Sequence, residues 1–215
     1  SSLQNKKSFS NPFILNPQNT VSALQKKLSL DKIRIKKNNY LNIWFGPFIM
    51  GQTNSSIVRR SAALLYENDD GYDKDFVYKE SAYYSSKWSA YLATILLALF
   101  IFSILSPLNK IVRFLLKKPG EGPSLKAMDE GFFKGKFLVN RGLDNQAVFE
   151  VFGKGDPGYK LTSLFVCESA LSLLGDKSNL PGKDKYGGVL TPASGLGDVL
   201  LKRLIKVGIC FKRTN

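Results

Sequence analysis

The longest apolar run of the chain, WSAYLATILLALFIFSILSPLN, extends from Trp88 to Asn109 and contains no charged residue. Its length meets the requirement of about 20 mostly apolar residues for a helix that crosses the hydrocarbon core of a bilayer. Apolar positions surround the helix axis instead of forming one stripe, as in helices that contact lipid or lie deep inside a protein. The pattern therefore predicts a membrane helix, with a buried core helix as the alternative. We expect Pro107 to kink or end it between Ser103 and Ser106.

The two ends of this run carry the residue types that mark membrane–water interfaces. Aromatic residues stand at its beginning and basic residues follow its end. The segment NKIVRFLLKKPGEGPS mixes apolar and basic residues, which is typical of a short amphipathic segment that lies on anionic headgroups. We expect membrane contact at Trp88, Tyr91, Leu96, Leu97, Phe100, Phe102, Leu105, Pro107, Lys110, Arg113, Lys117 and Lys118.

The rest of the pattern predicts an α+β fold. Upstream, a helix is expected to start at Asn54 or Ser55, with Arg59-Arg60 on its solvated face. Downstream, a hairpin around Gly142 precedes the helix YKLTSLFVCESALSLLG, a short strand or loop in GGVLTPA, the helix LGDVLLKRLIKVG and the strand ICFKR. This order, β-β-α-β-α-β, favours a largely antiparallel or mixed sheet with packed helices. The apolar face of the first of these helices is predicted at Leu164, Cys167, Leu171 and Leu174.

Four segments follow from these patterns. Residues 1–40 form a basic N-terminal extension, 41–87 the first part of an α/β domain, 88–118 the hydrophobic membrane segment with its basic flank, and 119–215 the α+β C-terminal part.

Composition narrows the chemistry. The net charge of +14 favours an anionic partner, either a lipid surface, nucleic acid or an acidic protein. Nucleic acid is the less favoured of these, because the chain has no zinc-finger spacing and no basic heptad helix. Histidine is absent, which removes Ser-His-Asp and Cys-His catalysis and most zinc sites. We assign no catalytic and no metal-binding residue, and we expect Cys167 and Cys210 to be reduced core thiols.

The stretch GKGDPG, from Gly153 to Gly158, matches the dinucleotide-binding pattern G-x-G-x-x-G. Two of its residues oppose that function. Pro157 has no amide hydrogen to donate to a pyrophosphate, and the carboxylate of Asp156 would repel one. We interpret Gly153, Gly155 and Gly158 as the turn before a helix, with Asp156 as its cap and Pro157 in its first turn. No cofactor is therefore expected to bind within this chain.

Longer motifs carry a family resemblance. The segments GPFIMGQTNSSIVRRSAALL, FVYKE, PGEGPS, GDPGYKLTSLFVCESALSLL and GGVLTPASGLGDVLLKRLIKVGICF occur in this order between residues 11 and 215. Together they resemble the C-terminal half of saccharopine-dehydrogenase-like oxidoreductases. The resemblance implies an α/β domain that completes an N-terminal Rossmann domain, whose glycine loop has no counterpart here. It also places both flanks of the apolar run in one domain. This favours a monotopic insertion broken at Pro107, with a true crossing as the alternative.

Two functions follow from the resemblance. The first is a membrane-associated, non-catalytic remnant of the oxidoreductase, acting as an accessory subunit of an organellar membrane complex, with the lipid bilayer and other subunits as partners. The mitochondrial inner membrane or a plastid is expected, because the basic start without Met fits a processed precursor. The alternative is the substrate or dimerisation half of an active NAD(P)-dependent reductase. Its NAD(P) would then be bound by a Rossmann domain missing from this sequence.

Overall fold

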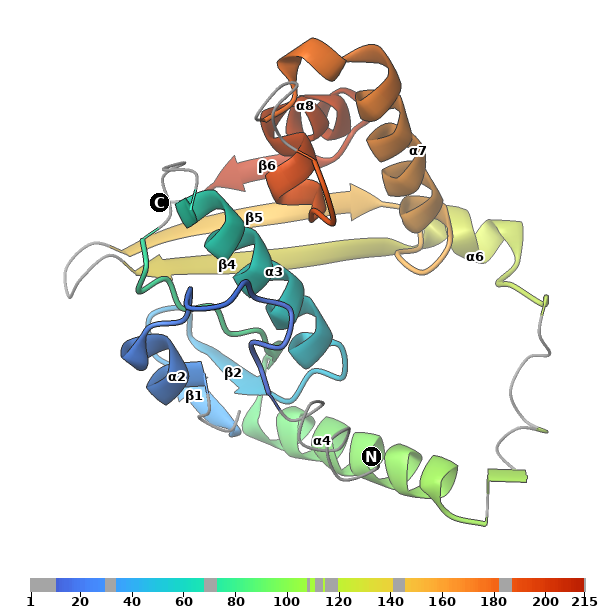
Figure 1. Cartoon of the computed structure of the whole chain (residues 1–215). Helices are drawn as coiled ribbons and strands as arrows, with labels where there is room; N and C mark the ends of the chain where they lie inside the picture. Colours follow the sequence, from blue (N-terminus) through green and yellow to red (C-terminus); the bar gives the residue numbers. More distant parts are fainter. Residues whose placement is uncertain are drawn as a thin grey trace. The chain divides into compact units, whose positions relative to one another are not determined.

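The computed structural model describes residues 11–29, 34–67, 73–107, 109–110, 114, 120–140, 146–181 and 187–214. The chain divides into two compact units, Ser1–Leu116 and Lys117–Asn215 (Figure 1). Within the described residues the fold is α+β, with two small antiparallel sheets and six α-helices. The fold class predicted from the sequence is confirmed at this level.

The first unit contains a three-stranded sheet in the order β1-β2-β3. Its elements are α2 (Ala23–Ser29), β1 (Lys36–Asn38), β2 (Ile43–Gly46), α3 (Gly51–Glu67), β3 (Ala82–Tyr84) and α4 (Lys87–Leu105). The small and apolar residues Ala62, Ala63 and Leu65 are the buried apolar positions of α3, and Phe13 is buried in the same unit. Helix α4 follows β3 after two residues and contacts β2 and β3.

The second unit contains a sheet in the order β4-β5-β6 with helices α7 and α8 packed against each other (Figure 1). Its elements are α6 (Leu125–Glu130), β4 (Phe132–Asn140), β5 (Gln146–Lys154), α7 (Lys160–Gly175), the 3₁₀ turn η1 (Lys177–Asn179), α8 (Pro192–Lys206) and β6 (Cys210–Arg213). Buried apolar side chains come from β5, from both helices and from the residue before β6: Val148, Leu161, Leu196 and Ile209.

Two predicted element bounds are corrected. Helix α3 begins at Gly51, before the expected Asn54 or Ser55. The strand option for GGVLTPA is wrong, because Thr191 starts helix α8 there. Its hydroxyl accepts a hydrogen bond from the backbone N–H of Ser194, and Pro192 occupies the first turn, where a missing amide hydrogen costs nothing.

The buried face of α7 also differs from the prediction. Leu171 and Leu174 are 45% and 82% exposed, whereas Leu161, Glu168 and Ser172 are buried. Glu168 is buried because Arg203 of α8 donates to it, from Nε to Oε2 at 2.8 Å. The side of α7 that is buried is thus determined in part by an ion pair, which hydrophobic periodicity cannot predict.

The two cysteines are free, and the expectation of core thiols is wrong, because both are exposed. Cys167 lies on the open side of α7, and Cys210 begins the edge strand β6. The apolar residues next to each cysteine in the sequence therefore did not predict whether its thiol is buried.

Arg203→Met is expected to destabilise the second unit by about 2–3 kcal/mol. Replacing Arg203 leaves the buried Glu168 without its charged partner. It also removes the hydrogen bond that Arg203 donates to Oδ2 of Asp176 at 3.2 Å. The neighbouring Lys202 is exposed and serves as the control, since Lys202→Met should change stability by less than about 0.5 kcal/mol. Urea unfolding followed by circular dichroism measures both. Equal midpoints for the two variants would contradict the structural role of Arg203.

Candidate functional site

Helix α4 is defined at both ends by side-chain and backbone hydrogen bonds. At its start, the hydroxyl of Ser86 accepts from the backbone N–H of Ser89, and the Ser89 hydroxyl accepts from the backbone N–H of Ser86. At its end, the backbone N–H of Ser106 donates to Phe102 O at 3.0 Å. The helix stops at Leu105, inside the interval expected from Pro107. It is long and apolar enough, by length and composition alone, to cross a membrane.

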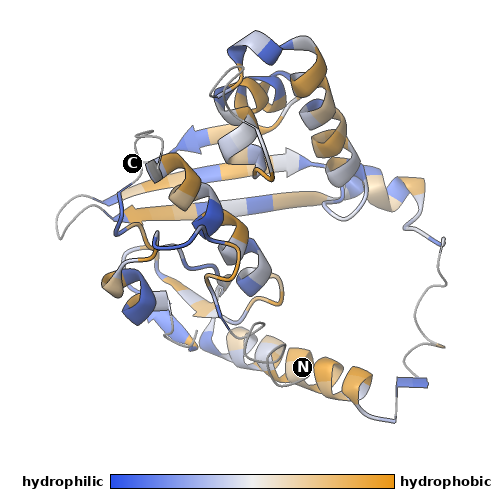
Figure 2. Cartoon of the chain, viewed as in Figure 1, coloured by the Kyte–Doolittle hydropathy of each residue, from blue (hydrophilic) through white to orange (hydrophobic). Residues whose placement is uncertain are grey.

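The side chains of α4 are largely exposed. Ala90 is its buried residue, whereas Trp88 and Leu105 at its two ends are 82% and 81% exposed. A helix in the core of a soluble protein would be mostly buried. In α4, by contrast, as little as 6% of the most apolar part is buried. Figure 2 shows the apolar colour continuing along the helix to its end. Among the described residues of its unit, α4 therefore presents an apolar surface that is covered near its start.

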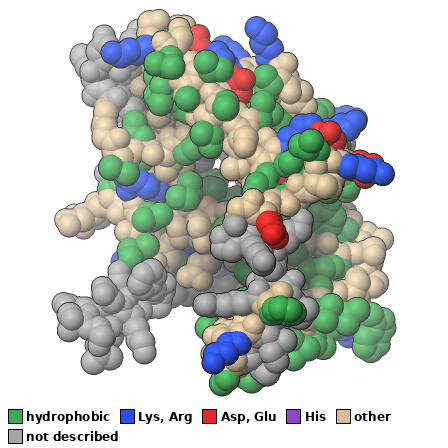
Figure 3. Space-filling model, turned by 90° about the vertical axis from the view of Figure 1, so that its right-hand side faces the viewer, with side chains coloured by type: hydrophobic (Ala, Val, Ile, Leu, Met, Phe, Trp, Pro, Cys, Tyr) green, Lys and Arg blue, Asp and Glu red, His purple; other side chains and the backbone are tan. Residues whose placement is uncertain are grey.

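The residues expected at the membrane are distributed as follows. Along α4, Tyr91, Leu96, Phe100 and Phe102 are exposed and Leu97 is half-buried. Pro107 and Lys110 are exposed beyond its end. Arg113, Lys117 and Lys118 lie outside the described residues. On the face drawn in Figure 3, hydrophobic side chains reach the surface among Lys and Arg side chains.

The glycine turn before α7 uses its amides internally. The backbone N–H of Gly155 donates to Gly131 O at 2.7 Å, and that of Asp156 donates to Met128 O at 2.8 Å. Oδ2 of Asp156 accepts from the backbone N–H groups of Tyr159 and Lys160, at 2.6 and 3.2 Å. A pyrophosphate at a helix start needs such amides to be available. The turn therefore uses the amides of Gly155 and Asp156 for its own hydrogen bonds, which does not suit a dinucleotide. Helix α7 begins at Lys160 with Tyr159 at its N-cap, so that Pro157 precedes the first turn instead of lying in it, and Asp156 stabilises the turn that leads into the helix.

Gly153 and Gly155 of this turn are needed for reasons other than a ligand. Gly155 has φ +123°, a conformation that favours glycine. Gly153 lies in β5, and a Cβ there would stand 2.5 Å from the ring of Phe133. Gly158, in contrast, would meet the Asp156 carboxylate at an ordinary 3.7 Å. That these glycines bind no cofactor stays a prediction.

A polar cluster in the first unit was missed from the sequence. Arg59 is buried, and its guanidinium donates to Pro12 O and Tyr78 O, each at 3.2 Å, while lying 5.3 Å from the centre of the Phe13 ring. Arg59 thus ties two distant segments to α3, and its expected place on a solvated face is wrong. Nothing in the sequence around Arg59-Arg60 distinguishes a buried arginine from a solvated one.

Tyr78 and Glu80 continue this cluster. The Tyr78 hydroxyl lies 3.5 Å from Oε2 of Glu80, and Nδ2 of Asn54 donates to Oε1 of the same carboxylate at 3.0 Å. Burial, together with the neighbouring Glu80 carboxylate, raises the pKa of Tyr78 to about 12. The phenol is thus protonated at neutral pH and can only donate to the carboxylate.

Because the folded pKa of Tyr78 exceeds the ordinary value of 10.0, unfolded chains lose this proton first as the pH rises. The stability that the neutral phenol contributes is therefore present below pH 10 and is lost as the pH rises through about 12. An ultraviolet titration of the nine tyrosines should show a last step near this value that Tyr78→Phe removes. Tyr83→Phe, at an exposed position, should leave the last step in place. An unchanged curve for Tyr78→Phe would contradict the assignment.

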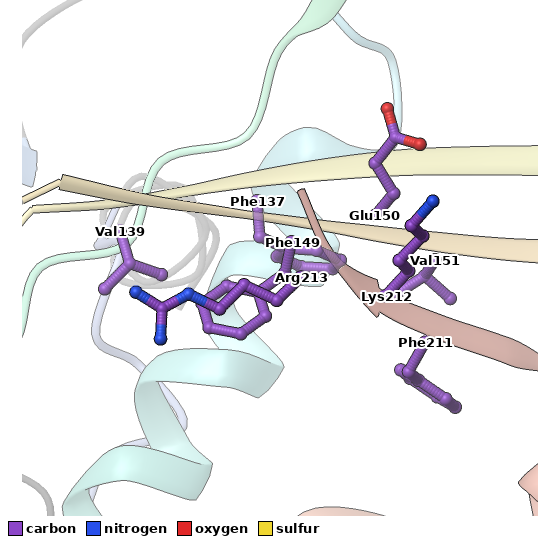
Figure 4. Close-up of a pocket in the computed structure, with 8 residues that line it drawn as sticks. All are labelled: Phe137, Val139, Phe149, Glu150, Val151, Phe211, Lys212 and Arg213. Carbon is purple, nitrogen blue, oxygen red and sulfur yellow. The ribbon is translucent and has the colours of Figure 1, made fainter. Parts of the chain in front are cut away.

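The second unit has a pocket of about 510 Å³ on its sheet. Five apolar side chains and one arginine form its surface: Phe137, Val139, Phe149, Val151, Phe211 and Arg213 (Figure 4). Glu150 and Lys212 also border it, but their side chains point to the other side of the sheet (Figure 4). The volume lies in the range of pockets that bind small molecules. No group of His, Cys, Asp and Glu side chains in the described part of the chain could hold a metal ion.

Comparisons with known proteins identify mycobacterial relatives. A protein of Mycobacterium tuberculosis (strain H37Rv), provisionally named a trans-acting enoyl reductase, is 30% identical over 98% of this chain and 51% of its own length. The trans-acting enoyl reductases of Mycobacterium ulcerans and Mycobacterium leprae are 31% and 28% identical, each over 80% of this chain and 41% of their own length. The chain spans about half the length of the curated relatives it matches. No family model and no solved structure matches the chain.

These relatives correct the resemblance to saccharopine-dehydrogenase-like proteins, because they are named as enoyl reductases. The motifs behind that resemblance perform structural tasks. GDPGYKLTS contains the turn before α7 and the first residues of this helix, and LTPASG forms the capped start of α8. Residues that shape helix starts carry little information about which reaction a protein catalyses.

The same relatives correct the functional prediction. The reading of the chain as a non-catalytic accessory subunit of an organellar membrane complex is wrong, since the similar proteins carry an enzyme's name. The missing histidines and the unsuitable glycine turn describe these 215 residues only. Neither feature therefore argues against catalysis by a longer protein that contains them. The alternative, part of a reductase, agrees better with the relatives.

Proposed function

We propose that these 215 residues form the substrate or dimerisation part of an NAD(P)H-dependent enoyl reductase. The observation that carries this proposal is the 30% identity, over 98% of the chain, to a relative named for enoyl reduction. An enoyl reductase reduces the carbon–carbon double bond of an α,β-unsaturated acyl group. The α+β fold with an apolar pocket in its second unit supports a part that handles an apolar substrate.

We place the nucleotide outside the described residues of this chain. The glycine turn supports this, because its amides already have acceptors and its carboxylate would meet a doubly negative pyrophosphate. No other G-x-G-x-x-G pattern follows a strand and opens a helix here. The whole enzyme therefore needs further polypeptide to hold NAD(P)H, either in the same chain or in a partner.

The test uses the native protein that contains these residues and, separately, the 215-residue chain. Intact mass first establishes the length of the native polypeptide, which we expect to exceed 23.9 kDa. We expect the native protein to consume NADPH or NADH when a long-chain 2-enoyl thioester is added, and the 215-residue chain to bind neither nucleotide stoichiometrically. Failure of the native protein to consume either nucleotide with any enoyl chain length would overturn the proposal.

We further propose that α4 holds the protein at a lipid bilayer. Its exposed apolar surface supports this, as do Trp88 and Tyr91 at one end and the exposed Lys110 beyond the other. A membrane-bound reductase would meet long acyl substrates where they dissolve. Protease protection on the two sides of α4 separates a crossing from a monotopic insertion. The organelle stays a prediction, since it rests on the basic start of the chain.

A further inference from the structure

The strand register of the second unit places apolar side chains in three neighbouring rows on one face of the sheet. Phe137 pairs with Phe149, which pairs with Arg213, and Val151 pairs with Phe211 in the next row. Val139 occupies the row on the other side. Paired residues of antiparallel strands point to the same face. Five apolar side chains and one guanidinium therefore share a continuous surface.

Helix α7 covers only one end of this face. There the ring of Phe165 meets that of Phe133 edge to face, with the ring centres 6.3 Å apart, and Phe133 in turn lies over Gly153. Two residues further along β4, Gly135 contributes no side chain to the face. Phe211, in the same row as Gly135, is 43% exposed, and beyond this row Phe137 and Val139 are 44% and 48% exposed. The helix packing of this unit ends where the pocket begins.

The opposite face differs in its central row. Glu150 there forms ion pairs with Lys134 and Lys136, with N···O distances of 3.5 and 3.0 Å, and Lys212 stands opposite Glu150. Charged groups in water are well solvated, whereas exposed aromatic side chains gain by being covered. The pocket face is thus the side of this row that a ligand would cover.

The size and charge of the pocket select the kind of occupant. A volume of about 510 Å³ suits a small molecule, whereas a stable protein interface covers about 800 Å² on each partner. Arg213 lies beside the Phe149 ring in the lining (Figure 4). A guanidinium group prefers carboxylate or phosphate oxygens as its partners. An apolar chain with an anionic group near its end matches both features.

We propose that this pocket binds the acyl chain of a long-chain acyl compound, with its anionic end beside Arg213. The proposal rests on the proposed reductase function for the long acyl chain. The anionic group follows from Arg213 and would be a carboxylate, or a phosphate of the group that carries the acyl thioester. The binding itself needs neither nucleotide nor turnover.

The test is calorimetric titration of the full chain with dodecanoate and with dodecanol, without nucleotide. Phe137→Asp places a charge on the pocket face and should weaken both ligands by about a hundredfold. Phe132→Asp, at a 63% exposed position on the other face, is the matched control and should leave both unchanged. Val139→Asp repeats the test if Phe137→Asp fails to fold.

Arginine and lysine variants test the anionic end separately. Arg213→Gln should weaken dodecanoate by about tenfold and leave dodecanol unchanged, while Lys212→Gln on the opposite face should affect neither. Both pairs of variants leave α4 intact, so that any binding to this helix is the same in all proteins.

Equal dodecanoate binding by wild type, Phe137→Asp and Val139→Asp would overturn the proposal. So would a wild-type dimer that Phe137→Asp converts to a monomer with unchanged ligand affinity, since the face would then bind a second copy. Pocket binding without enoyl reduction by the native protein would contradict the reductase function alone. Enoyl reduction that Phe137→Asp leaves unaffected, with no loss of dodecanoate binding, would contradict the pocket alone.

Discussion

Leu96→Asp together with Phe102→Asp is expected to abolish co-sedimentation of the protein with vesicles of mixed neutral and anionic phospholipid. The two side chains are 56% and 65% exposed on α4. Aspartate at the centre of a membrane helix costs about 2.5–3.5 kcal/mol. Leu96 lies at the centre of α4 and Phe102 nearer its end, so that the two aspartates together cost at least about 3 kcal/mol and reduce partitioning by more than about a hundredfold. Wild type should sediment with the vesicles, and more strongly as the anionic fraction rises, because the net charge is +14.

The control replaces two leucines that are more exposed and lie outside α4. Leu125 and Leu174 are 78% and 82% exposed in the second unit, and Leu125→Asp with Leu174→Asp should leave sedimentation unchanged. Because all four side chains face outward, none of the substitutions should disturb folding, which circular dichroism checks. The lipid role of α4 is wrong if wild type stays in the supernatant or if both double variants lose sedimentation equally.

Gly131→Ala is expected to destabilise the second unit by about 4 kcal/mol. A Cβ at Gly131 would stand 2.7 Å from both Cα and the backbone nitrogen of Asp156, which cannot move away as a flexible side chain would. Overpacking of this kind costs about 2 kcal/mol. The hydrogen bonds from Gly155 to Gly131 and from Asp156 to Met128 add about 1 kcal/mol each when they break.

Gly175→Ala is the matched control. Gly175 ends α7 in an open position with no heavy atom within 4 Å of a built Cβ, so alanine should be neutral or stabilise by less than about 1 kcal/mol. Both tryptophans, Trp44 and Trp88, lie in the first unit, so hydrogen–deuterium exchange of β4, β5 and α7 is the suitable measurement. Unchanged protection in Gly131→Ala would show that the close approach of α6 and the glycine turn is unimportant for stability.

The sequence predicted those elements whose apolar pattern is strong and local. The apolar run gave α4 with its end before Pro107, and alternating residues gave the β4–β5 pair. What it missed depends on partners distant in sequence. Glu168 is buried because of Arg203, and Arg59 because of carbonyl groups near residues 12 and 78. Such partners leave no periodic signal in either segment.

The candidate pocket was not predicted at all. Its residues come from three strands, and β6 joins them from the far end of the chain. Phe137 and Phe149 face each other only because of the hairpin register. The alternation of apolar and polar residues around them indicates a half-buried strand. It does not indicate which part of the sheet face a helix covers. The packing of α7 against one end of the sheet, which leaves the other open, emerges only from the fold.

The glycine pattern shows why a match in letters is weak evidence. Gly153, Gly155 and Gly158 stand in the spacing of a dinucleotide loop after a strand and before a helix. The deciding features are the acceptors that the turn's amides already have and the carboxylate at its centre. The proposed reductase function rests instead on similarity, over nearly the whole chain, to a relative named for enoyl reduction.

The reductase function is tested directly by transfer of deuterium to a long-chain 2-enoyl thioester by the native protein, from NADPH that carries deuterium at both C4 positions of the nicotinamide. We expect a saturated acyl product that carries one deuterium from the labelled nucleotide, with the nucleotide recovered in its oxidised form. An unreduced enoyl thioester, or a saturated product without deuterium from NADPH or equally labelled NADH, would contradict it.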